Sequence, residues 1–400
     1  MKILFIQPTN ALGGAEYSLL SLIKHLHKKK HNIFISIPYS EDKEYTNLLR
    51  PYVDEFIFVK PMPWHIEHKF KFGYKRFLNF LYKCYKSQGW HFTPVIKIYR
   101  FIKKNKIDIV HTNTILAIDG ALAAKFSGTP HIQHVREPIG LDERSLYKFP
   151  FQKRRSFFKK IMNILHHGVI ANSNFTLNLS KPYFGKEKLV CIYNPISADF
   201  FANQFIKDQN HASVKTIIGM IGNVTSKWKN HQLLIKIANI YKHSKSDIDL
   251  QFYIYGKLPN DSDWYFMELQ HQIKNYNLEG IVFFKGYCES LAIYKEIDLL
   301  MHTTTQEAFG RIYIEAMAMG VPVITVKGGG ALELIKNGEN GFLIEVDNPK
   351  GFVNKAEDLI RDNNLYRKIA KNGFIYSNKF RSDVISSKVE RYYNTIINGK

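Results

Sequence analysis

Short runs rich in β-branched residues alternate with longer amphipathic segments from one end of the chain to the other. This alternation is typical of parallel strands joined by crossover helices, so we predict the α/β class. In the first half, strands are expected at residues 2–7, 33–37, 107–111, 131–135, 168–171 and 189–193. In the second half, they are expected at residues 216–221, 251–255, 282–285, 299–302, 322–326 and 341–344.

The alternation breaks between residues 194 and 213, a stretch with several turn formers and no clear period. A chain of 400 residues also favours two domains over one large core. We therefore place a domain boundary at this break. Two doubly wound sheets put a ligand crevice at the carboxyl ends of their strands, between the domains, so functional residues are sought in loops that follow strands.

Composition narrows the class of protein. With 45% apolar and 23% charged residues, the chain is not disordered, collagen-like or coiled-coil. Its three cysteines, Cys84, Cys191 and Cys288, lack the spacing of a zinc site or a disulfide framework. The N-terminal run MKILFIQPTN is too short for a signal peptide, and no run of about 18 apolar residues occurs. We expect a cytoplasmic protein without a spanning helix.

The segment TTTQEAFGRIYIEAMAMGVPVITV, residues 303–326, predicts a loop, a helix and a strand in succession. Gly320 is placed to end the helix in a left-handed conformation, and Pro322 prevents its continuation. The start of such a helix offers N–H groups and a positive dipole end, which suit a phosphate. Glu307 and Glu315 can reach the same crevice and bind sugar hydroxyls. Taken alone, they are better explained as a helix-start acid and a solvated helix residue.

This segment resembles the E-x7-E signature of the retaining glycosyltransferases of family 4, the group 1 glycosyltransferases. The matching residues are Glu307, Phe309, Gly310, Glu315, Ala316, Met317, Ala318, Gly320, Pro322 and Val323. The resemblance implies the GT-B fold, with two Rossmann-like doubly wound domains facing a central cleft. It further implies an acceptor domain over residues 1–194, a donor domain over 195–378, and a C-terminal helix within 379–400 that crosses back to the first domain.

Further matches follow in the family's order. The segment GGGALELIKNGENGFLI, residues 328–344, places Gly330 and Glu333 beside the nucleotide by this resemblance. Gly14, in a Gly-Gly-Ala-Glu match after the first strand, would lie close to a phosphate or sugar. Ordinary turns between strands and helices remain the alternative explanation for both glycine-rich segments.

The phosphate site departs from the family pattern Gly-Arg-x4-Lys-Gly, because residues 222–230 read GNVTSKWKN. Lys229 fits the lysine, Asn223 stands where arginine is expected, and the spacing is one residue longer. Asn230 also replaces the second glycine. Without the arginine a charge-assisted phosphate contact is lost. We consider Lys227 and Arg311 as candidates to replace it.

The resemblance also implies individual roles. Lys229 and the N–H groups at residues 309–311, which include Gly310, would stabilise the leaving diphosphate. Glu315 would hold the ribose, and Glu307 would hold the transferred sugar, either as nucleophile or as electrostatic support. The strand-end residues His111 and His134 would lie near the sugar or the acceptor, or are structural. No Asp-x-Asp site is evident, so neither a metal ion nor a cofactor is expected.

The positive charge is concentrated in one half of the chain. Residues 1–200 hold 31 Lys and Arg against 14 Asp and Glu, whereas residues 201–400 hold 25 against 21. Residues 60–106 and 147–165 mix these cations with aromatic residues, a composition suited to an anionic membrane surface. No nucleic-acid motif occurs, so we expect no nucleic acid partner. A plain solvated basic surface remains the alternative.

Together these features predict a retaining glycosyltransferase that moves a sugar from a nucleotide-diphosphate sugar to an acceptor hydroxyl. The acceptor is expected to be a lipid-linked glycan in bacterial surface-polysaccharide synthesis, with the protein peripheral at the inner face of the cytoplasmic membrane. The alternative is a GT-B protein without transfer activity, either a nucleotide-sugar epimerase or a nucleotide-sugar-binding protein.

Overall fold

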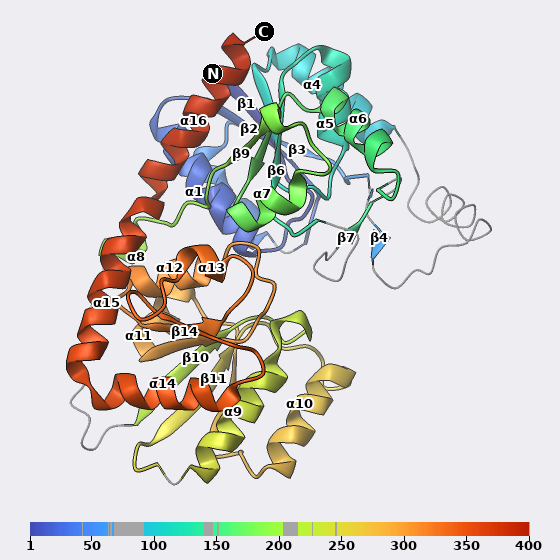
Figure 1. Ribbon diagram of the computed structural model, residues 1–400. Helices are drawn as coiled ribbons and strands as arrows, with labels where there is room; N and C mark the ends of the chain where they lie inside the picture. Colours follow the sequence, from blue (N-terminus) through green and yellow to red (C-terminus); the bar gives the residue numbers. More distant parts are fainter. Residues whose placement is uncertain are drawn as a thin grey trace. The chain divides into compact units, whose positions relative to one another are not determined.

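The computed structural model describes residues 1–41, 43–62, 64, 66–67, 92–139, 147–149, 152–202, 215–225, 227–244 and 246–399. The chain divides into two compact units (Figure 1). The first unit contains Met1–Pro195 and Ser382–Lys400, and the second contains Ile196–Arg381.

The sheet of the first unit is parallel, with the described strands in the order β3-β2-β1-β5-β6-β8-β9. These strands are β1 (Lys2–Ile6), β2 (Asn32–Ile37), β3 (Glu55–Phe58), β5 (Ile109–Thr112), β6 (His131–Val135), β8 (Gly168–Ala171) and β9 (Leu189–Cys191). Two short strands, β4 (Ile66–Glu67) and β7 (Tyr147–Lys148), form a separate antiparallel pair.

Helices cover both faces of this sheet. They are α1 (Gly14–Lys28), α2 (Glu44–Leu49), α4 (Thr93–Asn105), α5 (Asp119–Ser127), α6 (Arg155–Leu165), α7 (Asn174–Ser180) and α16 (Ser382–Asn398), with short 3-10 turns η1 (Arg50–Tyr52) and η2 (Lys186–Lys188). Alternate residues of β1 point to opposite faces, so Ile3 and Phe5 pack in one core with α1 and α16. Leu4 and Ile6 pack in another core with α4 and α5. Burial of both faces explains the continuous apolar runs of these strands.

The C-terminal helix α16 is fixed to the first unit by apolar and polar contacts. Tyr393 is fully buried in the core with α1, and its hydroxyl lies 2.5 Å from Nδ1 of His111 on β5. Nearer the surface, the Glu390 carboxylate lies 2.8 Å from Nε2 of His31. The last helix of the chain therefore completes the fold of the N-terminal part.

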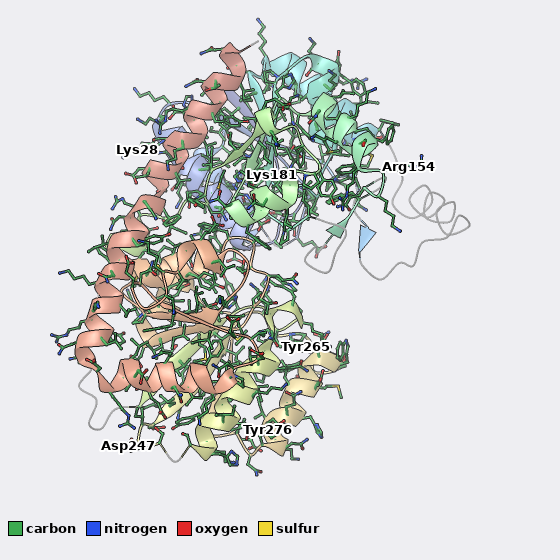
Figure 2. All side chains as sticks on the ribbon, in the orientation of Figure 1. Lys28, Arg154, Lys181, Asp247, Tyr265 and Tyr276 are labelled. Atoms are coloured by element: carbon green, nitrogen blue, oxygen red, sulfur yellow. The ribbon has the colours of Figure 1, made fainter. Side chains whose placement is uncertain are left out.

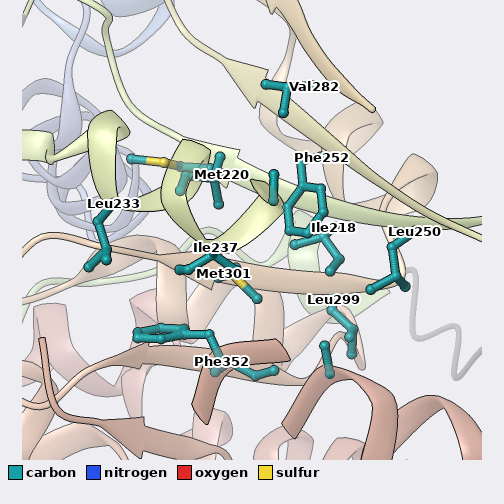
Figure 3. Close-up of a cluster of buried hydrophobic side chains, with 14 of the residues drawn as sticks. Ile218, Met220, Leu233, Ile237, Leu250, Phe252, Val282, Leu299, Met301 and Phe352 are labelled. Carbon is teal, nitrogen blue, oxygen red and sulfur yellow. The ribbon is translucent and has the colours of Figure 1, made fainter. Parts of the chain in front are cut away.

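The second unit is a parallel sheet whose described strands follow the order β12-β11-β10-β13-β14-β15. They are β10 (Thr216–Ile221), β11 (Leu250–Tyr255), β12 (Val282–Gly286), β13 (Leu299–His302), β14 (Val323–Val326) and β15 (Phe342–Ile344). Its helices are α8 (Asp199–Ala202), α9 (His231–His243), α10 (Trp264–Asn275), α11 (Ser290–Glu296), α12 (Arg311–Ala318), α13 (Ala331–Leu334), α14 (Pro349–Arg361) and α15 (Asn363–Ser377), with turns η3 (Lys227–Lys229) and η4 (Asn378–Phe380). Figure 3 shows the buried cluster in which Met220, Phe252 and Phe352 pack together with neighbouring strand residues.

The α/β prediction is confirmed, and each of the twelve predicted strands is present with its ends within two residues of the expected positions. The edge strand β3 was not predicted, because it is short and its residues are half-buried or exposed. Gly320 has the expected left-handed conformation after α12, with φ 72°. The assignment of acceptor binding to the first unit and donor binding to the second stays a prediction.

We expect Tyr393→Phe to lower the free energy of unfolding by about 1–3 kcal/mol, because the buried His111 ring loses the partner of Nδ1. Tyr392→Phe is the matched control, since the Tyr392 hydroxyl donates to Lys188 O from a half-buried position where water can replace it. Chemical denaturation of the two variants measures the difference. Equal losses would show that the His111 contact does not stabilise α16.

Candidate active site

Three loops meet at the carboxyl edge of the second sheet, after the neighbouring strands β10, β13 and β14. The Thr303 hydroxyl lies 3.1 Å from the carbonyl oxygen of Lys229 and 2.9 Å from that of Asn230, which joins the first two loops. The N–H of Gly330 donates to the carbonyl of Glu307 at 2.7 Å, which joins the second and third. The edge is therefore held by main-chain groups and the Thr303 hydroxyl.

The glycines after β14 permit this close approach. A Cβ on Gly330 would stand 2.6 Å from the carbonyl oxygen of Phe309, and one on Gly329 would stand 2.5 Å from that of Glu307. Gly329 also has φ 53°, in the region that favours glycine. Packing of one loop on another explains this motif, and the predicted contact of Gly330 with the donor stays a prediction.

The central interaction of the edge is an ion pair between Lys229 and Glu307. Their Nζ and Oε2 atoms are 2.9 Å apart, and the side chains are only 15% and 17% exposed. Burial raises the pKa of Glu307, but the adjacent Lys229 ammonium and the other polar groups beside the carboxylate together lower it by a larger amount, so the pKa lies well below its usual range. Glu307 is consequently a carboxylate at neutral pH. Sequence reasoning placed both residues in one site, and the structure brings them together.

Glu315 is the second glutamate of the motif, and it is only 4% exposed. The Arg311 Nε donates to its Oε1 at 2.5 Å, and the Tyr294 hydroxyl donates to its Oε2 at 3.0 Å. The alternative interpretation of Glu315 as a solvated helix residue is therefore wrong. Tyr294 comes from α11 and was missed, because a single tyrosine in a short amphipathic helix has no distinguishing sequence signal.

The helix after Glu307 begins as the sequence predicted. Gly310 precedes α12 with φ 91°, and a Cβ there would meet the Tyr313 ring at 2.2 Å. The Phe309 side chain is buried, and its ring lies 5.8 Å from that of Phe380. Only main-chain groups of Phe309 can therefore serve a ligand. Glu333, in α13, is half-buried, and its carbonyl accepts a hydrogen bond from the Tyr376 hydroxyl at 3.0 Å.

The two departures from the family pattern have different structural consequences. Asn230 adopts φ 59°, a left-handed conformation that asparagine tolerates, and so it substitutes for the missing glycine. Asn223 accepts a hydrogen bond from the N–H of Lys257 at 3.0 Å, which ties the loops after β10 and β11 together.

Neither cation proposed to replace the arginine lies free at this edge. The Arg311 side chain pairs with Glu315, and the Lys227 Nζ lies 4.7 Å from the centroid of the Trp264 ring. Their predicted role beside the diphosphate stays a hypothesis. Lys257, whose main chain pairs with Asn223, is an exposed cation that sequence reasoning did not consider.

The predicted residues of the first unit lie in two places. His134 Nδ1 is 3.3 Å from His111 Nε2, and both rings are buried. Burial lowers the pKa of both, to about 3 for His111, so both are neutral at neutral pH. His111 contacts the Tyr393 hydroxyl and His134 contacts His111, which gives the pair a structural role, and a role in catalysis stays a prediction. Gly14 begins α1, and no described heavy atom lies within 4 Å of a Cβ built on it.

Two family models match the chain over almost its whole length. Residues 12–200 match the model described as Glycosyltransferase Family 4, and residues 202–375 match the model described as Glycosyl transferases group 1. The chain belongs to the group 1 glycosyltransferases of family 4. It is therefore a glycosyltransferase with the GT-B fold, and it has relatives in polysaccharide biosynthesis.

The relatives differ in how much of each protein is matched. The capsular polysaccharide biosynthesis glycosyltransferase CapM of Staphylococcus aureus is 30% identical over 187 residues, 45% of this chain and 46% of that protein. The N-acetyl-alpha-D-glucosaminyl L-malate synthase of Bacillus anthracis is 25% identical over 336 residues, 80% of this chain and 84% of that one. The HepE protein of Anabaena, solved with UDP-glucose, has a TM-score of 0.77, 23% identity and coverage of 99% and 100%. That likeness shows the fold.

We expect Gly330→Ala in this glycosyltransferase to lower the free energy of unfolding by about 1–3 kcal/mol, because a methyl group would clash with fixed main-chain atoms. Gly280→Ala is the matched control, since no described atom lies within 4 Å of a Cβ there. Denaturant unfolding of both variants measures the difference. A stable Gly330→Ala variant would mean that the loops do not need this close approach.

Proposed function

We propose that this chain transfers a sugar from a nucleotide-diphosphate sugar to an acceptor hydroxyl, with retained anomeric configuration and without a metal ion. The Lys229–Glu307 ion pair carries the proposal. It places a cation and an ionised carboxylate 2.9 Å apart beside the start of α12. A reaction that separates an anionic diphosphate from a cation-like sugar centre needs one group of each sign.

The positive groups suit the leaving diphosphate. Lys229 supplies a full charge, and the first turn of α12 supplies N–H groups and the positive end of the helix dipole. Charge-assisted hydrogen bonds of this kind are stronger than neutral ones. In this proposal the protein neutralises the developing charge itself.

The two glutamates suit the sugar parts of the donor. Glu307 is anionic and largely buried, so it can stabilise an oxocarbenium-like centre and accept hydrogen bonds from the transferred sugar. Glu315 is already oriented by Arg311 and Tyr294, and its remaining lone pairs can accept bonds from ribose hydroxyls. UDP-glucose, bound by the HepE protein, is the first donor to test.

The acceptor proposed is a lipid-linked glycan at an anionic membrane, in a surface-polysaccharide pathway like that named for CapM. Helices α4, α5 and α6 cover one face of the first sheet (Figure 1), and their outward side chains form a basic apolar face. We define this face by the exposed residues Ile96, Lys97, Arg100, Lys104, Lys125, Phe126, Arg155, Phe157, Lys160 and Ile164. Arg154, labelled in Figure 2, precedes α6.

Charge and apolar surface together favour a lipid headgroup layer. The exposed side chains of α4, α5 and α6 include no acid, since Asp119 is buried. Each cation near an anionic surface contributes about 1 kcal/mol. No helix in the described ranges is long and apolar enough to cross a bilayer. Residues 68–91, which hold much of the predicted basic stretch, lie outside the described residues.

The donor site is tested by thermal shift with UDP, GDP and ADP sugars. One donor class should raise the unfolding midpoint of the parent protein. Lys229→Ala should weaken that donor about tenfold or more, because a charge-assisted bond worth about 1.5–3 kcal/mol is lost. Glu315→Ala should weaken it as well, whereas Glu345→Ala, an exposed carboxylate paired with Lys327, should not. Donor binding without transfer to any acceptor would favour the nucleotide-sugar-binding alternative.

The membrane surface is tested by flotation with vesicles. The parent protein should float with anionic vesicles and not with neutral ones. The triple variant Lys97→Glu, Lys104→Glu and Lys160→Glu should lose binding by about a hundredfold, because three cations at about 1 kcal/mol each contribute about 3 kcal/mol. A matched variant with Lys236, Lys274 and Lys368 changed to Glu, all exposed in the second unit, should keep it. Equal losses of vesicle binding in both variants would show that binding depends on the net charge of the protein and not on this face.

A further inference from the structure

His302, the last residue of β13, lies next to the Lys229–Glu307 ion pair. Its side chain is fully buried, and neither ring nitrogen has a hydrogen-bond partner among the described residues. Oε2 of Glu307 lies 3.6 Å from Nε2 of His302. This is the same oxygen that Lys229 contacts at 2.9 Å. Two nitrogen groups therefore face one carboxylate oxygen, and only one of them is bonded to it.

The position of the His302 ring is fixed by its surroundings. The Tyr313 ring of α12 packs edge-on at 5.5 Å between centroids. The Thr325 hydroxyl of β14 lies 3.1 Å from the carbonyl oxygen of His302 and 3.2 Å from the Tyr313 hydroxyl. A small closing movement of the Glu307 carboxylate is enough to bring Oε2 within hydrogen-bond distance of Nε2.

Among the residues that the structure describes, four ionisable groups lie near the imidazole. They are Glu307, Lys229, the Tyr313 phenol and His231 at the start of α9. Burial lowers the pKa of His302, and Lys229 lowers it further, while Glu307 acts in the opposite direction. The pKa of His302 is therefore below its ordinary value, and His302 is neutral at pH 7 as long as Lys229 is paired with Glu307. His231 has a pKa lowered to about 4, chiefly by burial, and is neutral as well.

A bound diphosphate would change this balance. If the Lys229 ammonium turns to the phosphate to form charge-assisted bonds with it, the 2.9 Å contact with Glu307 lengthens or breaks. Once Lys229 turns away, Glu307 is a largely buried carboxylate without its cation, and a second anion stands nearby. Both changes favour a positive charge on the imidazole, because an unpaired buried charge is costly.

We propose that His302 is a positioning residue. When the donor's diphosphate draws Lys229 away, His302 replaces it as the hydrogen-bond partner of the Glu307 carboxylate and gains a proton from solvent. The proton resides on Nε2, which then donates to Oε2 of Glu307 and aims the carboxylate at the sugar. No covalent bond forms or breaks in this step. The inference rests on the proposed function, since it requires an anionic donor at Lys229.

The proposal fixes the sign of the pH dependence. A group whose pKa is higher in the complex than in the free protein makes binding tighter as pH falls between those two values. Donor affinity should therefore increase as pH falls, by up to about tenfold per pH unit in that window. Above and below the window it should be constant.

The first experiment needs no donor. Protein labelled with ¹³C at histidine Cε1 is titrated by NMR, and the His302 signal is assigned by its loss in His302→Gln. In the parent, this signal should titrate below the ordinary range of histidine. In Lys229→Gln, where the cation is removed, its pKa should rise by at least one unit, while the control Lys227→Gln leaves it unchanged. An unaltered His302 titration in Lys229→Gln would overturn the proposal.

The second experiment measures the proton taken up on binding. UDP-glucose is titrated calorimetrically at pH 7 in buffers of different ionisation enthalpy, because its diphosphate has no group that titrates near neutral pH. The parent should take up as much as about one proton per donor, and His302→Gln should take up none while still binding. Uptake that persists in His302→Gln would overturn the proposal. If UDP-glucose gives no binding heat, the proposed donor is wrong, and the NMR titration alone decides the role of His302.

Discussion

The contact between the Lys229 ammonium and the Glu307 carboxylate is the interaction on which the account of this protein depends. Both groups are more than four-fifths buried, so neither can be left unpaired at small cost. In the proposed reaction each is also a group that acts on the donor, the cation on the diphosphate and the anion on the sugar. The structure pairs the two charges with each other, and we propose that a donor binds by replacing that pairing.

The main chain around the ion pair is built to keep the two side chains in reach of each other. Thr303 ties the loop after β13 to the loop after β10, and the N–H of Gly330 ties the loop after β14 to Glu307 itself. Glu315 is oriented separately by Arg311 and Tyr294. Rigid main-chain support combined with side chains that can change partners is what a site needs if it must recognise a ligand and then act on it.

The fold was largely predictable because both sheets are buried on both faces. Strands in such sheets have continuous runs of apolar residues, which are easily recognised in the sequence. The edge strand β3 was missed because its residues are exposed or half-buried, so it has no continuous apolar run. Glu307, Glu315 and Lys229 were found through a spaced motif. His302 and Tyr294 were not found, because each is a single residue whose role depends on which segment folds next to it. The left-handed conformation of Asn230 likewise explains a departure that sequence alone left as a discrepancy.

A double-mutant cycle on nucleotide affinity tests whether a donor's diphosphate competes with Glu307 for Lys229. The ligand should be a nucleoside diphosphate without its sugar, so that contacts of Glu307 to the sugar do not enter. If the two compete, Glu307→Gln binds the nucleotide more tightly than the parent, and this gain disappears when Lys229 is replaced by Met. If Glu307→Gln weakens binding, or tightens it equally with and without Lys229, the two groups do not compete and the account is wrong.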